Sequence, residues 1–443
     1  DGQYIGDIAL AGGKFSATDN QVLGGTLSIT ADSELTVSQG YTLTLSQAGG
    51  LALGGNALTI SGGGSFVSGG LTLNNVVSKL LLNSITLDSA STTADSLGID
   101  VDADSTVTAL SVGDITPISI AAGKTLSGAI AVTAGSLKLT ETGTLASNVT
   151  MSGGTLDADE TSTVSGALTQ AGNISIDVLT GKTLTFSTGE IKTESHQLTL
   201  AGEGTIAFPS NASGIVLNNA AGLLKLDGTG TLGAAKVTAV SNAGKGLAVN
   251  ASSTISSLKV AANTELNVAQ GKVLSGSTEV AAATTLKLSG TGTFGSALNL
   301  LGTLEAGANL TVSGLISVGG NSAVSIPANT TLTYTGGDLK VGAYSLSIGG
   351  AGTFSNDVNS PLVLDVAGSI LDLSGSGTIT GPLKLESGTL KASAGSPTIS
   401  GALTQYADAT IEVVANQTLN YTGASLNLGA NKLSLIGGGT FNN

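Results

Sequence analysis

The sequence predicts an all-β fold, a β-solenoid of the right-handed parallel β-helix type with roughly 21 coils. Three observations predict it: a recurring nine-residue phrase, period-two alternation of apolar residues, and regular spacing between the copies. Leu286–Phe294, LKLSGTGTF, is one copy of the phrase. The same pattern of apolar and small residues begins at Leu58, Leu137, Leu198, Leu224, Leu346, Leu371 and Leu433.

The phrase describes a short strand that bends and then resumes. Leu286 and Leu288 alternate with polar residues, which is the pattern of a strand with one buried face. Gly290 and Gly292 permit a bend that a residue with a Cβ would resist. The last position, Phe294 in this copy, is always apolar and predicts an inward stack with one residue per copy. Its other members are Phe66, Leu145, Ile206, Leu232, Phe354, Ile379 and Phe441.

One copy departs from the pattern, because Glu141 replaces the first glycine in the copy at Leu137. Between the copies, short runs such as Thr26–Ile29 and Thr42–Leu45 alternate with clusters of Gly, Ser, Asn and Asp. Such runs are rich in Thr and β-branched residues and bounded by turn formers, so they predict strands. Helix is disfavoured because apolar residues at helical spacing are scarce.

The spacing of the copies shows a long internal period. From Leu137 onward, successive copies lie 61, 26, 62, 60, 25 and 62 residues apart, and every copy recurs after 147 to 149 residues. If about 61 residues make three coils and about 25 make one, the long period holds seven coils of roughly 21 residues. A repeat of this length cannot bury its own apolar face, so stacking of repeats must form the core.

The predicted organisation is an irregular N-terminal start or cap in residues 1–21, followed by a continuous solenoid in residues 22–443. Coils spaced as parallel strands would give a rod on the order of 100 Å long. A string of antiparallel β-sandwiches is the main alternative. It fits less well, because the repeat is far shorter than a sandwich of about 100 residues and the chain has no Trp.

Composition excludes several classes of protein. Charged residues make up only 10% of the 443 residues, and all 16 basic residues are Lys. The net charge of −14 argues against a nucleic-acid partner, which requires a basic patch. The absence of Cys excludes disulfides and thiolate metal sites. No apolar run is long enough for a membrane span.

The phrase, the G-x-L-T/S runs and the Gly/Thr/Asn turns resemble the passenger regions of autotransporters and haemagglutinin-like bacterial surface proteins. The resemblance is one of repeat style and covers the chain from about Val22. It implies an exported parallel β-helix that is extracellular or at the cell surface. No C-terminal β-barrel pattern and no secretion domain accompany it, so the export route is open.

Two acidic clusters are candidate cation sites. Asp100, Asp102 and Asp104 alternate, so on a strand their carboxylates would share one face and could hold calcium through oxygen ligands. Asp157 together with Asp159 and Glu160 is a weaker version. A solvated acidic strip is the simpler interpretation of both, because neither recurs along the repeats as a calcium array would. No cofactor is otherwise expected.

No catalytic residues are expected, and the protein is predicted not to be an enzyme. His196, the only histidine, lies in a turn where the equivalent positions of other copies carry unrelated residues. Paired acids for glycoside hydrolysis would need a cleft with sugar-binding neighbours, and the acids here are scattered. Thr-Leu-Thr units recur only once in several coils, too sparsely for an ice-binding face. Sequons such as those of Asn148, Asn309 and Asn329 are expected by chance.

The leading functional hypothesis is a structural protein, a solenoid rod that serves as a fibre or filament subunit or a surface stalk. Phe441 stands near the last residue with no polar cap after it, so end-to-end self-association is the expected partnership. The alternative is an adhesin or glycan-binding passenger whose lateral face binds a surface glycan or a protein.

Overall fold

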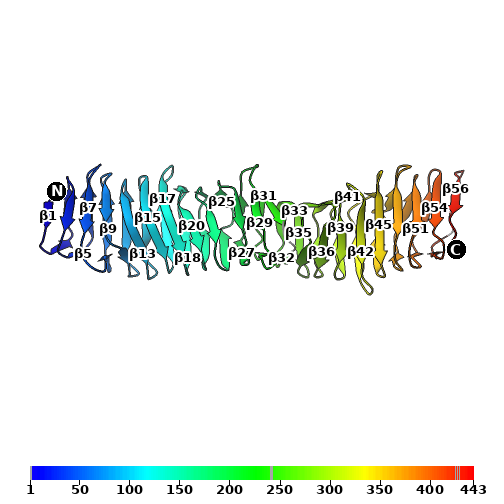
Figure 1. Ribbon diagram of the computed structural model, residues 1–443, viewed down its shortest axis with the longest axis horizontal. Helices are drawn as coiled ribbons and strands as arrows, with labels where there is room; N and C mark the ends of the chain where they lie inside the picture. The colour runs from blue at the N-terminus through cyan, green and yellow to red at the C-terminus, as the bar shows by residue number, and fades with distance from the viewer. Residues whose placement is uncertain (1, 240–242, 425, 427, 429) are drawn as a thin grey trace. The chain divides into compact units, whose positions relative to one another are not determined.

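The predicted β-solenoid is confirmed. A computed structural model describes residues 2–239, 243–424, 426, 428 and 430–443, and these form a parallel β-solenoid of about 20 turns without helices. The strands belong to two compact units. One comprises residues 1–215 and 229–235, and the other comprises residues 216–228 and 236–443. Within each unit, successive turns stack side by side (Figure 1).

Each full turn runs along three sides. The first-side strands of the first unit are β3 (Lys14–Ala17), β6 (Ser33–Val37), β9 (Ala57–Ser61), β12 (Lys79–Asn83), β14 (Gly98–Val101), β16 (Thr116–Ile120), β18 (Ser136–Leu139), β21 (Thr155–Ala158), β24 (Ile174–Val178) and β27 (Gln197–Gly202). Those of the second unit are β30 (Leu223–Leu226), β32 (Ala243–Val249), β34 (Thr264–Val268), β36 (Thr285–Ser289), β39 (Thr303–Ala306), β42 (Ser322–Ile326), β45 (Ser345–Gly350), β48 (Ile370–Leu373), β51 (Thr389–Ala392), β54 (Ala409–Val413) and β56 (Leu433–Ile436).

The second and third sides follow in every turn. In the first unit they are β1 (Gly2–Tyr4), β2 (Ile8–Ala11), β4 (Gln21–Leu23), β5 (Leu27–Ala31), β7 (Thr42–Leu45), β8 (Leu51–Ala52), β10 (Ser65–Val67), β11 (Leu71–Leu73), β13 (Thr86–Thr92), β15 (Ser105–Val112), β17 (Thr125–Val132), β19 (Thr144–Leu145), β20 (Asn148–Met151), β22 (Ser162–Val164), β23 (Leu168–Gln170), β25 (Thr183–Phe186), β26 (Glu190–Lys192) and β28 (Thr205–Ala207). Two strands contribute residues to both units, β29 (Gly214–Leu217) and β31 (Thr231–Ala239).

The second unit continues in the same manner. Its remaining strands are β33 (Ser253–Val260), β35 (Val273–Val280), β37 (Thr293–Phe294), β38 (Ala297–Leu300), β40 (Leu310–Val312), β41 (Ile316–Val318), β43 (Thr331–Tyr334), β44 (Leu339–Lys340), β46 (Thr353–Asn356), β47 (Leu362–Leu364), β49 (Thr378–Ile379), β50 (Leu383–Leu385), β52 (Thr398–Ile399), β53 (Leu403–Gln405), β55 (Thr418–Tyr421) and β57 (Thr440–Asn442).

Strand pairing sets the length of a turn. Leu286 pairs with Leu304, 18 residues on, and Leu346 pairs with Leu371, 25 residues on. The spacing reaches 26 residues between Thr205 and Thr231. All pairings between the named strands that the structure describes are parallel, and an example from the other unit is Leu137 with Leu156. Variation in turn length lies in the corners, because the strands keep their register. The irregular spacing of the phrase in the sequence follows from these corner insertions.

Some strands run through a corner and serve two sides. In β15 and β17 the register shifts between Val107 and Leu110, opposite Gly128, whose φ is +122°. The same shift recurs between β33 and β35, opposite Gly276, whose φ is +119°. Gly128 and Gly276 are 148 residues apart, so the long period of the sequence reproduces a β-bulge in each unit.

The core consists of inward columns of apolar side chains. On the first side, Leu80, Ile99 and Ile118 are in register and buried. The inward stack predicted from the last position of the phrase is also buried from Phe66 to Ile379. Its last member, Phe441, is partly exposed because no described turn follows it. Packing within these columns supplies the apolar burial that drives folding.

Parallel pairing includes residues before Val22. Gln3 of β1 pairs with Val22 of β4, and Phe15 of β3 pairs with Leu35 of β6. The segment expected to be irregular therefore contains strands. Among the described residues, no helix is long and apolar enough to cross a membrane.

Candidate functional site: the lateral surface

Outward positions of the first side carry charges that alternate from turn to turn. Glu265, Lys287 and Glu305 occupy successive turns in register in the second unit. The Lys287 ammonium lies 3.6 Å from the Glu305 carboxylate, and the Ser289 hydroxyl donates a hydrogen bond of 2.6 Å to Glu265. Opposite charges directly across neighbouring strands stabilise a sheet modestly. This column therefore satisfies its own charges.

The same arrangement recurs further along. Asp372, Lys391 and Glu412 are in register, and the Lys391 ammonium lies 3.1 Å from Glu412. These side chains are about one-third exposed, at 32% for Lys391 and 29% for Glu412. Partly exposed pairs contribute little to the free energy of folding. The buried Oδ1 atom of Asp372 has no hydrogen-bond partner among the described residues, so the acids of this column are only partly paired.

The weaker acidic candidate forms a similar cluster in the first unit. Lys138 lies 2.8 Å from Asp159 and 3.5 Å from Asp157. The hydrogen bond from Lys138 to Asp159 raises the pKa of the lysine. Burial raises the pKa of Asp157, and the neighbouring charges of Asp159 and Asp177 raise it further. The third acid, Glu160, is paired with Lys182 instead.

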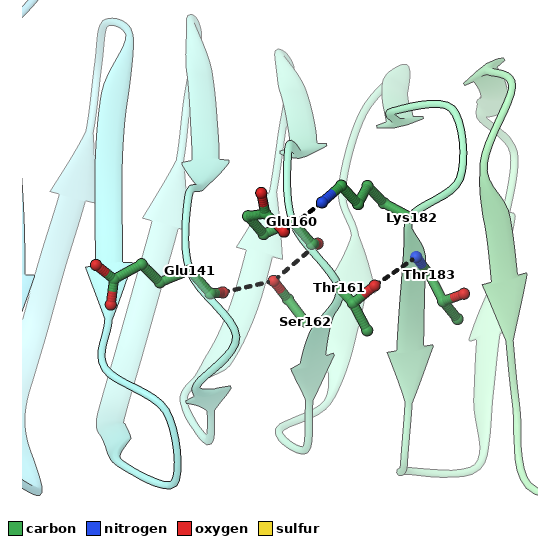
Figure 2. Close-up of polar contacts among 6 residues, drawn as sticks. All are labelled: Glu141, Glu160, Thr161, Ser162, Lys182 and Thr183. Carbon is green, nitrogen blue, oxygen red and sulfur yellow. Dashed lines mark hydrogen bonds and ion pairs between the residues drawn. The ribbon is translucent and has the colours of Figure 1, made fainter.

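Figure 2 shows the corner where Glu160 lies. The Ser162 hydroxyl contacts the carbonyl oxygens of Glu141 and Glu160, at 2.9 and 3.1 Å. The backbone N–H of Thr183 donates to the Thr161 hydroxyl at 3.2 Å. The Glu141 carboxylate points away from this network (Figure 2). Every drawn contact joins neighbouring turns or closes a corner, so these polar residues connect the turns.

Asn and Asp at other corners have the same role. The Asn263 carboxamide accepts the backbone N–H of Thr285 at 2.9 Å in the next turn. Asn148 and Asn309, two of the sequon residues, bind Ala167 and Thr331 in this way. Further examples are Asp7 with Thr26, Asp32 with Ala57, Asn173 with Gln197, Asn321 with Ser345 and Asp408 with Lys432. A corner carboxamide or carboxylate thus replaces a missing ladder bond.

The cation candidates Asp100, Asp102 and Asp104 do not share one strand, which corrects the sequence-based geometry. β14 ends at Val101, so Asp102 and Asp104 lie in the turn that follows. Asp100 lies 2.6 Å from the Lys79 ammonium, and Asp104 accepts the N–H of Thr125 at 2.9 Å. The described residues contain no group of three acids or histidines placed to hold a metal. Calcium binding stays a prediction.

His196 lies in a corner, where its backbone N–H donates to the carbonyl of Thr193 at 3.0 Å. Asn329 occupies the third position of a similar corner with a φ of +61°, a conformation that Asn tolerates better than most residues. Both residues therefore take part in turns.

Outward threonines of the second side are more regular than the sequence indicated. Thr125, Thr144, Thr163 and Thr185 are in register over successive turns of the first unit. A matching row in the second unit consists of Thr331, Thr353, Thr378 and Thr398. The expectation concerned whole Thr-x-Thr units, and these do not recur in every turn, since Ala146 follows Thr144 two residues on and Ser165 follows Thr163. The single-threonine rows are hidden in the sequence because turn lengths vary.

Two open hollows lie on the first side. The first, of about 350 Å³, contains Lys14, Asp32 and Glu34, and the Lys14 ammonium is 2.7 Å from Glu34. The second, of about 450 Å³, has a floor of Gly302, Thr303 and other small residues. Both are shallow and lack a set of convergent catalytic groups.

Exposed apolar side chains gather at two other places. In the second unit, Tyr344 is 41% exposed, with Val366 and Ile370 in the next turn, and Tyr406 is 59% exposed two turns further on. On β56, Leu435 and Ile436 are also exposed.

Comparison with known proteins adds no further assignment: no family model, no curated protein and no solved structure matches this chain.

Proposed function

We propose that the chain is a non-enzymatic structural protein, an extracellular β-solenoid that acts as a fibre subunit or surface stalk. The observation that carries the proposal is the unbroken parallel ladder inside each unit. Lateral charges pair with one another, as Lys391 does with Glu412, and corner carboxamides bind the next turn. Many described polar contacts of the surface thus join neighbouring turns.

Exposure on β56 supports assembly from end to end. Leu435 is 58% exposed, whereas Leu200 and Ile348 at equivalent positions of the repeat are 6% and 8% exposed. The outer edge of β56 also offers backbone groups that pair with no described strand. Another turn of the same kind, stacked on β56, would bury Leu435 as the following turns bury Leu200 and Ile348. We propose that an end turn of a second copy supplies it.

Electron microscopy and sedimentation of the purified 443-residue chain test this proposal. Filaments should form and lengthen with protein concentration. Leu435→Lys should abolish them, because a charge would be buried in the new contact. Val76→Lys is the matched control, since Val76 is 61% exposed on a lateral corner, and it should assemble normally. Single particles at all concentrations, or equal assembly of both variants, would contradict the proposal.

The adhesin alternative rests on the exposed tyrosines. Tyr406 is 59% exposed. The preceding residue, Gln405, pairs with Leu385, so Glu386 lies across from Tyr406 in the neighbouring turn. An aromatic ring next to a carboxylate suits a glycan, which presents both an apolar face and hydroxyl groups. A panel of surface glycans should then show saturable binding that Tyr406→Ala weakens. Tyr41→Ala is the control, and unchanged binding by Tyr406→Ala would exclude this face.

A further inference from the structure

Two buried polar side chains in the core of the first unit each contain an oxygen atom without a hydrogen-bond partner among the described residues. Gln170 is 4% exposed and Thr193 is 0% exposed. The Gln170 amide group donates to the carbonyls of Gly172 at 3.0 Å and Gln197 at 2.8 Å. Its Oε1 atom and the Thr193 hydroxyl bond to no described atom. Leaving a buried polar atom unpaired is costly, so each requires an explanation.

The two side chains occupy the same column in neighbouring turns. β23 and β26 lie side by side, and the Thr188 hydroxyl donates to the carbonyl of Gly166 at 2.8 Å just before them. Inward residues of the two turns are Leu168 and Gln170 in one, Ile191 and Thr193 in the other. Stacking of inward positions therefore sets Leu168 against Ile191 and Gln170 against Thr193.

The long repeat provides an internal comparison. In the next copy of the long repeat, 148 residues on, Val318 stands at the position of Gln170 and Val341 at the position of Thr193. Val341 is 0% exposed, so its position remains a core position. The two sites are polar together in one copy and apolar together in the other. Such joint replacement is expected if the polar pair serves one shared interaction.

We propose that Gln170 and Thr193 form a binding site for a single ordered water molecule inside the solenoid. The water donates one hydrogen bond to Gln170 Oε1 and accepts one from the Thr193 hydroxyl. Its second hydrogen is available to a backbone carbonyl of the adjoining turns. Buried waters of this kind typically make about three hydrogen bonds to otherwise unpaired groups. Val318 and Val341 of the other copy have no polar side-chain atoms and need no water.

A high-resolution crystal structure of the full chain tests the site directly. Density for one water within hydrogen-bond distance of both Gln170 Oε1 and Thr193 Oγ1 is expected, with none between Val318 and Val341. Density absent at the polar pair would overturn the proposal. So would a direct hydrogen bond from Thr193 to Gln170.

A double-mutant cycle in solution tests the coupling. Gln170→Met and Thr193→Val each preserve volume but leave one polar atom without the shared water, so each should lower Tm by about 2–4 °C. The double variant should lose less than the sum of the two, because neither partner of the water is then left unpaired, while the carbonyls of Gly172 and Gln197 lose their donor equally in Gln170→Met alone. Val341→Thr is the control. It should lower Tm, because the new buried hydroxyl lies opposite Val318, which has no polar atom to share a water. Additive losses would overturn the proposal.

Discussion

The two glycines of the repeated phrase meet different requirements. Gly290 has a φ of +85°, which side chains with a Cβ rarely adopt. Gly292 has no such angle, but a Cβ there would lie 2.4 Å from the carbonyl oxygen of Ala269 in the previous turn. Where Glu141 replaces the first glycine, the backbone avoids positive φ. A Cβ at Gly290 would also lie 2.3 Å from the carbonyl oxygen of Val268, so contact between turns restricts both positions, and the first accepts a side chain only where the backbone changes its φ, as at Glu141.

Gly292→Ala should lower the free energy of unfolding by about 1–3 kcal/mol, because the added methyl overpacks the core. A Cβ at this position would also lie 2.6 Å from the Val268 side chain, so no small shift relieves the contact. Gly189→Ala is the control, since its Cβ would meet nothing within 4 Å. Denaturant unfolding of both variants measures the difference. If the two variants are equally stable, neighbouring turns can move apart at Gly292 without a cost in free energy.

Asp88 should make stability depend on pH at the acid end. Burial raises its pKa, but hydrogen bonds from Ser68 and Gly69 outweigh this and hold the pKa below its ordinary value of 3.8. The ionised form is therefore favoured in the folded state, and its contribution is lost as pH falls through that range. The stability difference between the parent and Asp88→Asn should shrink below about pH 4. Ser68→Ala, which removes one of the hydrogen bonds that lower this pKa, should weaken the trend, and an unchanged trend would contradict the assignment.

At the scale of the strand, alternation was sufficient to predict most of the core. Inward positions such as Leu58 and Leu286 are buried as expected, because a period of two leaves one face for the interior. Register between turns could not be predicted, since corners of variable length intervene. The threonine rows and the glutamate–lysine pairs, such as Glu412 with Lys391, depend on that register. The candidate surface thus became visible only with the structure.

Reversing one charge on the first side tests the register of its column. Lys391→Glu would place three acids on neighbouring strands with Asp372 and Glu412, at a cost of about 1–2 kcal/mol for two like-charge contacts. High salt should remove most of the loss by screening. Lys340→Glu is the control, because Lys340 pairs with Val363 in its ladder and faces no acid there. A loss that persists in 1 M salt would point to packing instead of charge.

At the scale of the molecule, each turn packs chiefly against its two neighbours. Contacts of this kind make stability a sum of terms for turns and for the interfaces between them. The 148-residue period adds equivalent positions in the two units, since Leu156 and Leu304 are inward and buried at the same point of the repeat. The chain therefore contains its own matched sites for comparing local stability.

Native-state hydrogen exchange should show this locality. Leu156→Ala deletes core volume in β21 and should raise exchange most in the paired strands β18 and β24, with the effect fading over further turns. Leu304→Ala should do the same around β39, in β36 and β42. β56 and β57 should exchange fastest in the parent chain, because Leu435 is exposed there. If hydrogen exchange instead became faster to the same extent throughout the chain, the chain would unfold as one cooperative unit, and its stability would not be a sum of contributions from single turns.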